Sequence, residues 1–200
     1  MRILYYVPII HTSEEYGVLS SAIRQAFICR LGEKVFEKFQ EEICAYWRLV
    51  EARIKKTVHD FDGLIIYQDS FPVGSREKVL EFFGHLFRDH PQKSPNFNLV
   101  KKLLDKGAIL EGTEDMNLVL EQMKVYQLVS EASSPLEQNR ILAENATHAR
   151  EVMRKRDVFI AQRICVTLPG DGRGILFIGR DHDVTGELAK LPEKIRIISL

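Results

Sequence analysis

The chain has 200 residues, of which 45% are hydrophobic and 28% are charged, as expected for a folded globular protein rather than a disordered one. Lysine plus arginine equals aspartate plus glutamate, at 28 each, so the overall charge gives no reason to expect binding to nucleic acid or to an anionic membrane. No stretch approaches the roughly 20 apolar residues of a membrane span, and the first apolar run is too short for a signal peptide. We therefore expect a single domain over residues 1–200.

The cysteines Cys29, Cys44 and Cys165 are too widely spaced for a CxxC pair or a zinc motif. Each lies in a helical pattern among apolar neighbours, so we expect three buried free thiols. Free thiols are typical of a reducing compartment, and this favours a cytoplasmic location.

Strand and helix patterns alternate from the first residues onward. Residues 2–10 are a short apolar run typical of a buried strand, and residues 14–30 predict a helix. Residues 33–58 predict a long helix with one apolar stripe and a strongly charged opposite face. This helix either covers one face of the sheet or pairs across a two-fold axis, so a homodimer is one hypothesis.

The middle of the chain continues the alternation. Residues 63–67 and 108–111 predict the second and third strands, and each is followed by acidic residues. Helices are expected at about 75–88, 96–105 and 114–131.

The last third of the chain begins with residues 136–166, which predict one long helix or two abutting ones. Residues 174–179 and 195–199 predict the last two strands. The whole pattern predicts an α/β fold with a mostly parallel central sheet of about five strands, flanked by helices.

Polar side chains that bind metals or move protons follow four of the predicted strands. They are His11, Asp69, Glu111 with Glu114, and His182. Open α/β sheets bind ligands at the carboxyl ends of their strands. If the first and fourth strands are parallel neighbours, His11 and His182 emerge at the same edge, where they would serve a metal or metal-free acid–base chemistry. Zinc, manganese or iron suits this ligand set.

Some of these residues also have plainer explanations. Strand ends meet solvent, where polar side chains are common, and Thr113 has the position of a helix cap. The carboxylate of Glu114 would stabilise the N-terminus of the following helix through the helix dipole, with or without a role in a site. Arg156 precedes an apolar stretch, so it either lies on a solvated face or points to the sheet edge and holds a carboxylate or an oxyanion.

Four short motifs occur in a set order along the chain. They are Pro8-Ile9-Ile10-His11, Glu111-Gly112-Thr113-Glu114, Arg156-Asp157-Val158-Phe159-Ile160-Ala161 and Gly179-Arg180-Asp181-His182. The set resembles the superfamily that joins TraB and Tiki proteins, erythromycin-esterase-like proteins and ChaN-like haem-binding lipoproteins. That family has two G-x-x-H motifs, an acidic strand end and an Arg-Asp helix followed by a small residue. Here the second G-x-x-H is intact, the first lacks its glycine, and the early Gly-Glu-x-His dyad is absent.

The resemblance implies an α/β fold and a site that includes Arg156 and Asp157. It implies no single reaction, because Tiki proteins are described as metal-dependent proteases, esterase-like members cleave a lactone and ChaN-like members bind haem. The leading hypothesis is a hydrolase-like enzyme that acts on a small-molecule or peptide substrate. In its metal version, His11, Glu111 and His182 bind a divalent ion that lowers the pKa of a bound water.

The remaining candidates complete this hypothesis. Asp69 or Glu114 accepts the proton, and Arg156 stabilises the developing anion. Two alternatives stay open, namely a module that binds a metal, haem or a small anionic ligand without turnover, and a dimeric interaction protein.

Overall fold

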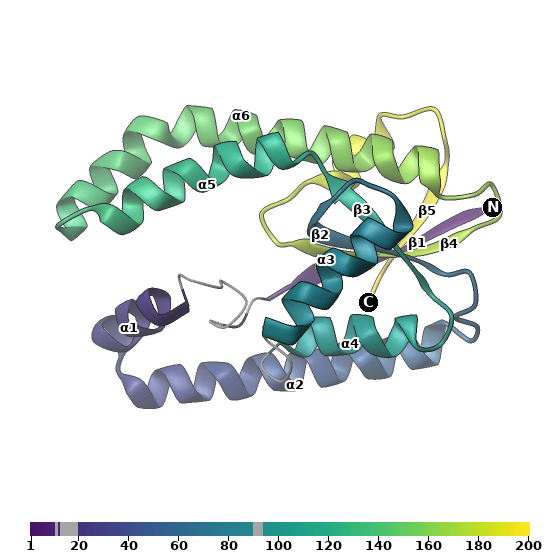
Figure 1. Ribbon diagram of the computed structural model, residues 1–200, viewed down its shortest axis with the longest axis horizontal. Coiled ribbons are helices and arrows are strands. Elements are labelled where there is room, and N and C mark those ends of the chain that lie inside the picture. The colour runs from purple at the N-terminus through teal and green to yellow at the C-terminus, as the bar shows by residue number, and fades with distance from the viewer. Residues whose placement is uncertain (11, 13–19, 90–93) are drawn as a thin grey trace.

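The computed structural model describes residues 1–10, 12, 20–89 and 94–200. Five parallel strands form one sheet in the order β3-β2-β4-β1-β5, which confirms the predicted α/β fold (Figure 1). The strands are β1 (Arg2–Ile9), β2 (Ile65–Pro72), β3 (Ile109–Glu114), β4 (Arg173–Gly179) and β5 (Ile195–Ser199).

Helices cover both faces of the sheet (Figure 1). They are α1 (Ser20–Leu31), α2 (Glu33–Thr57), α3 (Arg76–Asp89), α4 (Pro95–Leu104), α5 (Met116–Glu131), α6 (Pro135–Thr167) and α7 (Val184–Ala189). Residues 136–166 therefore lie in one continuous helix rather than two abutting ones. Among the described residues, no helix combines the length and the apolar character needed to cross a membrane.

The two faces of the sheet form two separate apolar cores. Ile66 and Phe177 pack with α2, α3 and α4 on one face, whereas Ile65 and Leu176 pack with α6 and α7 on the other. Successive strand residues point to opposite faces, so a strand buried on both sides must be apolar throughout. This requirement explains the short apolar runs in the sequence.

The apolar stripe of α2 serves mainly the first of these cores. Its buried residues are Phe36, Ile43, Trp47, Val50 and Ile54. Two further apolar residues of this helix, Val35 and Phe39, are exposed. The hypothesis that this helix covers one face of the sheet is therefore confirmed, and dimerisation through it stays a prediction.

The expectation of three buried thiols is wrong for two of them. Cys165 is buried, but Cys29 and Cys44 are exposed. Cys44 directly follows the core residue Ile43, and one residue turns the side chain by about 100° around the helix axis. Cys29 lies two residues after Phe27, which packs on α2, so it faces away from that contact.

Strands β1 and β4 are parallel neighbours, with Ile9 in register with Gly179. This satisfies the condition under which the residues that follow the two strands emerge at one edge. His11 lies outside the described residues, as does most of the segment before α1.

Gly112 allows β3 to approach β2 closely next to that edge. A Cβ atom on Gly112 would lie 2.1 Å from the carbonyl oxygen of Pro72. The register between the strands shifts between Gln68 and Pro72, and the Val73 amide donates to the Glu114 carbonyl at 3.1 Å. The absence of a side chain at residue 112 thus brings the end of β3 beside β2.

Gly112→Ala should destabilise the fold, because backbone atoms must move to admit the methyl group. We expect a loss of about 1–3 kcal/mol in the free energy of unfolding, measured by urea denaturation. Gly170→Ala is the control, since nothing lies within 4 Å of a Cβ atom there. Equal stability of the two variants would contradict this account of the close approach.

Candidate active site

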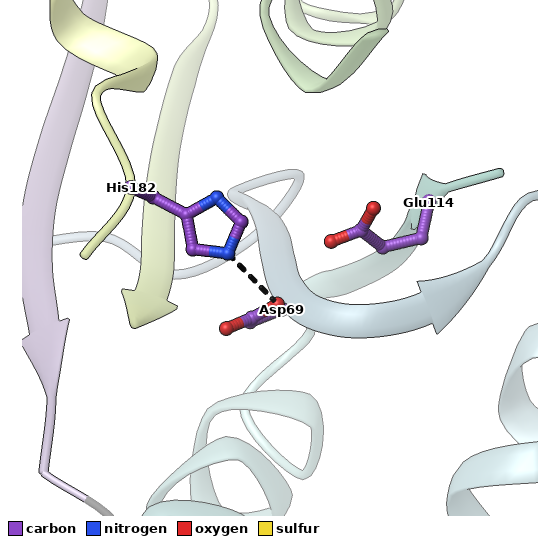
Figure 2. A group of neighbouring side chains, drawn as sticks. All are labelled: Asp69, Glu114 and His182. Atoms are coloured by element: carbon purple, nitrogen blue, oxygen red, sulfur yellow. Dashed lines mark ion pairs between the residues drawn. The ribbon is translucent and has the colours of Figure 1, made fainter. Parts of the chain in front are cut away.

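Three buried ligand-type side chains converge where the strands end. Asp69 comes from β2, Glu114 ends β3, and His182 lies in the turn after β4. One ligand atom from each lies within 4.8 Å of the other two, and Figure 2 shows the Glu114 carboxylate directed toward the other two side chains. This is the group that could hold a metal ion within the part of the chain that the structure describes.

Both carboxylate oxygens of Asp69 accept hydrogen bonds. Oδ2 accepts a hydrogen bond from the Gly179 amide at 3.0 Å, and Oδ1 accepts one from the Ser70 hydroxyl at 3.2 Å. Ser70 has a φ of 64°, in the left-handed region that non-glycine residues rarely adopt. Such local strain clusters at functional sites, where the surrounding contacts maintain it.

The intact Gly179-Arg180-Asp181-His182 motif has a physical reason for its first and last residues. The His182 amide donates to the Gly179 carbonyl at 3.2 Å and closes the turn. A Cβ atom on Gly179 would lie only 3.1 Å from Asp69 Oδ2. Glycine therefore lets Asp69 bind the backbone of β4 while the turn brings His182 over the same carboxylate.

Asp157 fixes the orientation of the His182 ring. His182 Nδ1 lies 2.5 Å from Asp157 Oδ1, and Asp157 Oδ2 accepts from the Asp183 amide at 3.0 Å. A carboxylate accepts only, so Nδ1 carries the proton and the lone pair of a neutral ring is on Nε2. Nε2 faces the carboxylate group, 3.9 Å from Asp69 Oδ1.

Arg156 lies between the two strand-end carboxylates. Its Nη2 donates to Asp69 Oδ1 at 2.9 Å and to Glu114 Oε1 at 2.5 Å. Its Nε donates to Glu114 Oε2 at 3.2 Å, and its Nη1 donates to the side-chain oxygen of Gln122. The prediction that Arg156 points to the sheet edge and holds a carboxylate is confirmed, and its role toward a developing anion stays a prediction.

The burial of these charges sets the electrostatics of the site. Burial raises the pKa of the Glu114 carboxyl, against the hydrogen bond and charge of Arg156, which act to lower it. Burial also acts to lower the pKa of Arg156, but Glu114 and Asp69 outweigh it and raise that pKa. Arg156 therefore stays charged. The group contains three carboxyl side chains, those of Asp69, Glu114 and Asp157, and one guanidinium.

The structure brings together five of the seven predicted site residues. They are Asp69, Glu114, Arg156, Asp157 and His182. Glu111 lies outside this group and forms an ion pair with Arg163. It precedes Glu114 by three strand residues, or about 10 Å along β3, so the two carboxylates meet different partners on α6.

The predicted cap of the next helix is wrong. Thr113 belongs to β3, and its hydroxyl donates to the Gln68 carbonyl at 2.6 Å. Asp115 caps α5 instead, where its side chain accepts from the Asn117 amide. Glu114 therefore ends a strand, and this position directs it into the site.

Two residues of the site were missed by the sequence interpretation. Gln122 lies on the buried face of α5 with Val119 and Val125, and a glutamine in such an apolar stripe is a signal that could have been recognised. The conformation of Ser70 has no comparable sequence signal, because serine is common in ordinary turns.

The comparisons with known proteins give no neighbour. No family model, no curated protein and no solved structure matches this chain. The likeness of its motifs to the TraB and Tiki superfamily therefore stays an expectation, and the geometry of the site has to support a function by itself.

Arg156→Met should be strongly destabilising, because it leaves buried carboxylates without their cation. We expect a loss of about 3–5 kcal/mol in unfolding free energy at neutral pH, measured by urea denaturation. Arg163→Met is a matched control on the same helix, because its ion pair with Glu111 is more exposed and should contribute less. The account fails if both variants lose the same free energy.

Proposed function

We propose that the protein is a hydrolase-like enzyme whose site holds a divalent metal ion on Asp69, Glu114 and His182. The observation that carries the proposal is the convergence of these three buried side chains, with their ligand atoms within 4.8 Å of one another. An imidazole with two carboxylates suits zinc, manganese or iron. The excess of carboxylates over guanidinium in the group also favours a cation.

The three donors would have to move closer together to bind one ion. Metal bonds of about 2.0–2.2 Å in tetrahedral geometry place the donors of one ion about 3.3–3.6 Å apart. The separations here, up to 4.8 Å, would shorten by as much as about 1.5 Å. Arg156 would have to share or give up its bonds to Asp69 and Glu114, because a cation would bind the same oxygens.

Asp157 supports His182 as a ligand. Metal-binding histidines usually donate their second ring N–H to a carboxylate, which fixes the ring and makes the ligating nitrogen more basic. The Nδ1 contact with Asp157 is of this kind and leaves Nε2 for the ion. His11, which follows β1 in the sequence and lies outside the described residues, stays a predicted additional ligand.

A divalent ion in this position would lower the pKa of a bound water and so supply a nucleophile for an ester, lactone or peptide bond. An Arg156 released in part from its carboxylates would hold the developing anion. The likeness to esterase-like and Tiki proteins supports this reaction class. Haem has less support, because His182 Nε2 faces a carboxylate 3.9 Å away.

Metal binding without turnover is the second candidate. The three ligand residues are at most 9% exposed, and such burial limits the access of a substrate. A screen of esters, lactones and peptides with metal-loaded protein separates the two. Turnover that is lost in His182→Ala supports the enzyme, and metal binding without turnover supports the second candidate.

Elemental analysis of protein purified without chelator is the direct test of the site. We expect about one zinc, manganese or iron per chain, with most of it lost in Asp69→Asn, Glu114→Gln and His182→Ala. Glu111→Gln is the control, because Glu111 pairs with Arg163 and should not affect metal content. Circular dichroism verifies that each variant is folded.

The metal contents of the four variants distinguish the two ligand sets. Loss of metal in Glu111→Gln, with retention in Glu114→Gln, would favour the ligand set expected from the sequence over the one proposed here. Equal metal content in all four variants would overturn both sets. If the purified protein carries no metal, calorimetric titration with Mn²⁺ and Zn²⁺ compares metal binding among the same four variants.

Asp157→Asn should weaken metal binding by about 10- to 100-fold, because the amide no longer fixes the ring as a carboxylate does. The measurement is the dissociation constant for Zn²⁺ or Mn²⁺. Asp181→Asn, in the same turn but exposed, is the control and should bind as the unaltered chain does. An unchanged constant for Asp157→Asn would remove the proposed role of this carboxylate.

A further inference from the structure

The helices α5 and α6 form an arm that extends beyond the sheet (Figure 1). We define the arm as α5 together with residues 135–150 of α6. The 33 residues of α6 span about 50 Å. The residues of α6 that belong to the core, Ile160, Ala161 and Ile164, lie in its C-terminal half, outside the arm. Apart from the first part of α5, which lies against β2, the arm is thus a pair of helices without a sheet behind it.

The outer face of α5 on this arm is partly apolar and exposed. Leu120, Met123 and Leu128 are 53%, 52% and 49% exposed. They line a shallow hollow of about 800 Å³ that also includes Asn145 and His148 of α6. Two helices alone bury only the seam between them, so such side chains are the ones that a further pair of helices would cover.

The charges on this face are of both signs and close together. Glu121 and Lys124 are three residues apart on α5, so they are neighbours on the helix surface, and both line the hollow. His148 of α6 lies 3.2 Å from Glu121. A face with balanced charges does not select a strongly acidic or strongly basic partner, but it suits a copy of itself.

We propose that the arm binds the arm of a second copy of this chain about a two-fold axis and forms a four-helix bundle. In a two-fold contact the same patch serves both subunits. If the two α5 helices run antiparallel with the axis midway between residues 121 and 124, Glu121 of each copy lies opposite Lys124 of the other. The exposed leucines on either side then supply apolar contact.

This interface differs from the one that the sequence predicted. The apolar stripe of α2 is mostly used inside the molecule, whereas the arm leaves Leu120, Met123 and Leu128 exposed. The inference does not depend on the proposed hydrolase activity, because none of the interface residues belongs to the metal-binding group.

Sedimentation velocity over a concentration series tests the interface. We expect the unaltered chain to be dimeric at micromolar concentrations, and Leu120→Glu/Leu128→Glu to be monomeric. Val35→Glu is the matched control, because Val35 on α2 is 48% exposed and should leave the dimer intact. All these positions are at the surface, and circular dichroism verifies that the variants fold.

Charge exchange tests the antiparallel pairing. Glu121→Lys and Lys124→Glu should each raise the dissociation constant of the homodimer at least tenfold, because each places like charges opposite one another. An equimolar mixture of the two variants should regain affinity, since every Lys then faces a Glu across the interface. The double variant Glu121→Lys/Lys124→Glu should also regain it.

Three results would overturn the proposal. One is a concentration-independent monomer for the unaltered chain, and another is a dimer that persists in Leu120→Glu/Leu128→Glu. The third is a dimer lost in Val35→Glu, which would move the interface to α2. Failure of the mixture and of the double variant to regain affinity would overturn the two-fold antiparallel pairing.

Discussion

The buried guanidinium of Arg156 is the interaction on which the arrangement of the site depends. It joins α6 to the ends of β2 and β3 through Asp69 and Glu114, and it reaches α5 through Gln122. None of these charges can be buried alone without a large cost in free energy. The four elements must therefore meet in one relative position for the charges to be satisfied.

Two consecutive residues of α6 organise the two halves of the site. Arg156 binds the carboxylates that end β2 and β3, while Asp157 orients His182 after β4. Neighbouring residues on a helix point about 100° apart, so one turn of α6 contacts both the carboxylates and His182. The close approach of β3 at Gly112 and the strained Ser70 complete the placement of the carboxylates.

The site and the arm share a helix. Gln122 accepts from Arg156 and donates to the hydroxyl of Tyr126 at 3.1 Å, and Tyr126 is half exposed on the same helix. A contiguous set of hydrogen bonds thus runs from the buried carboxylates to the surface of α5. A dimer formed through the arm would place the second copy near this helix, although outside the metal-binding group.

The sequence alone determined the α/β class, the five strands and the two long helices, because the periods of apolar residues differ between strand and helix. It also indicated Asp69, Glu114, Arg156 and His182, because polar residues that interrupt or end apolar segments are conspicuous, whereas Asp157 was indicated only by the resemblance of its motif to a known superfamily. Tertiary structure alone decided which of them meet. Strand order, the register shift beside Gly112 and the rotation of α6 separate Glu111 from Glu114 and direct Arg156 to carboxylates. These are contacts between distant segments, and local periodicity carries no information about them.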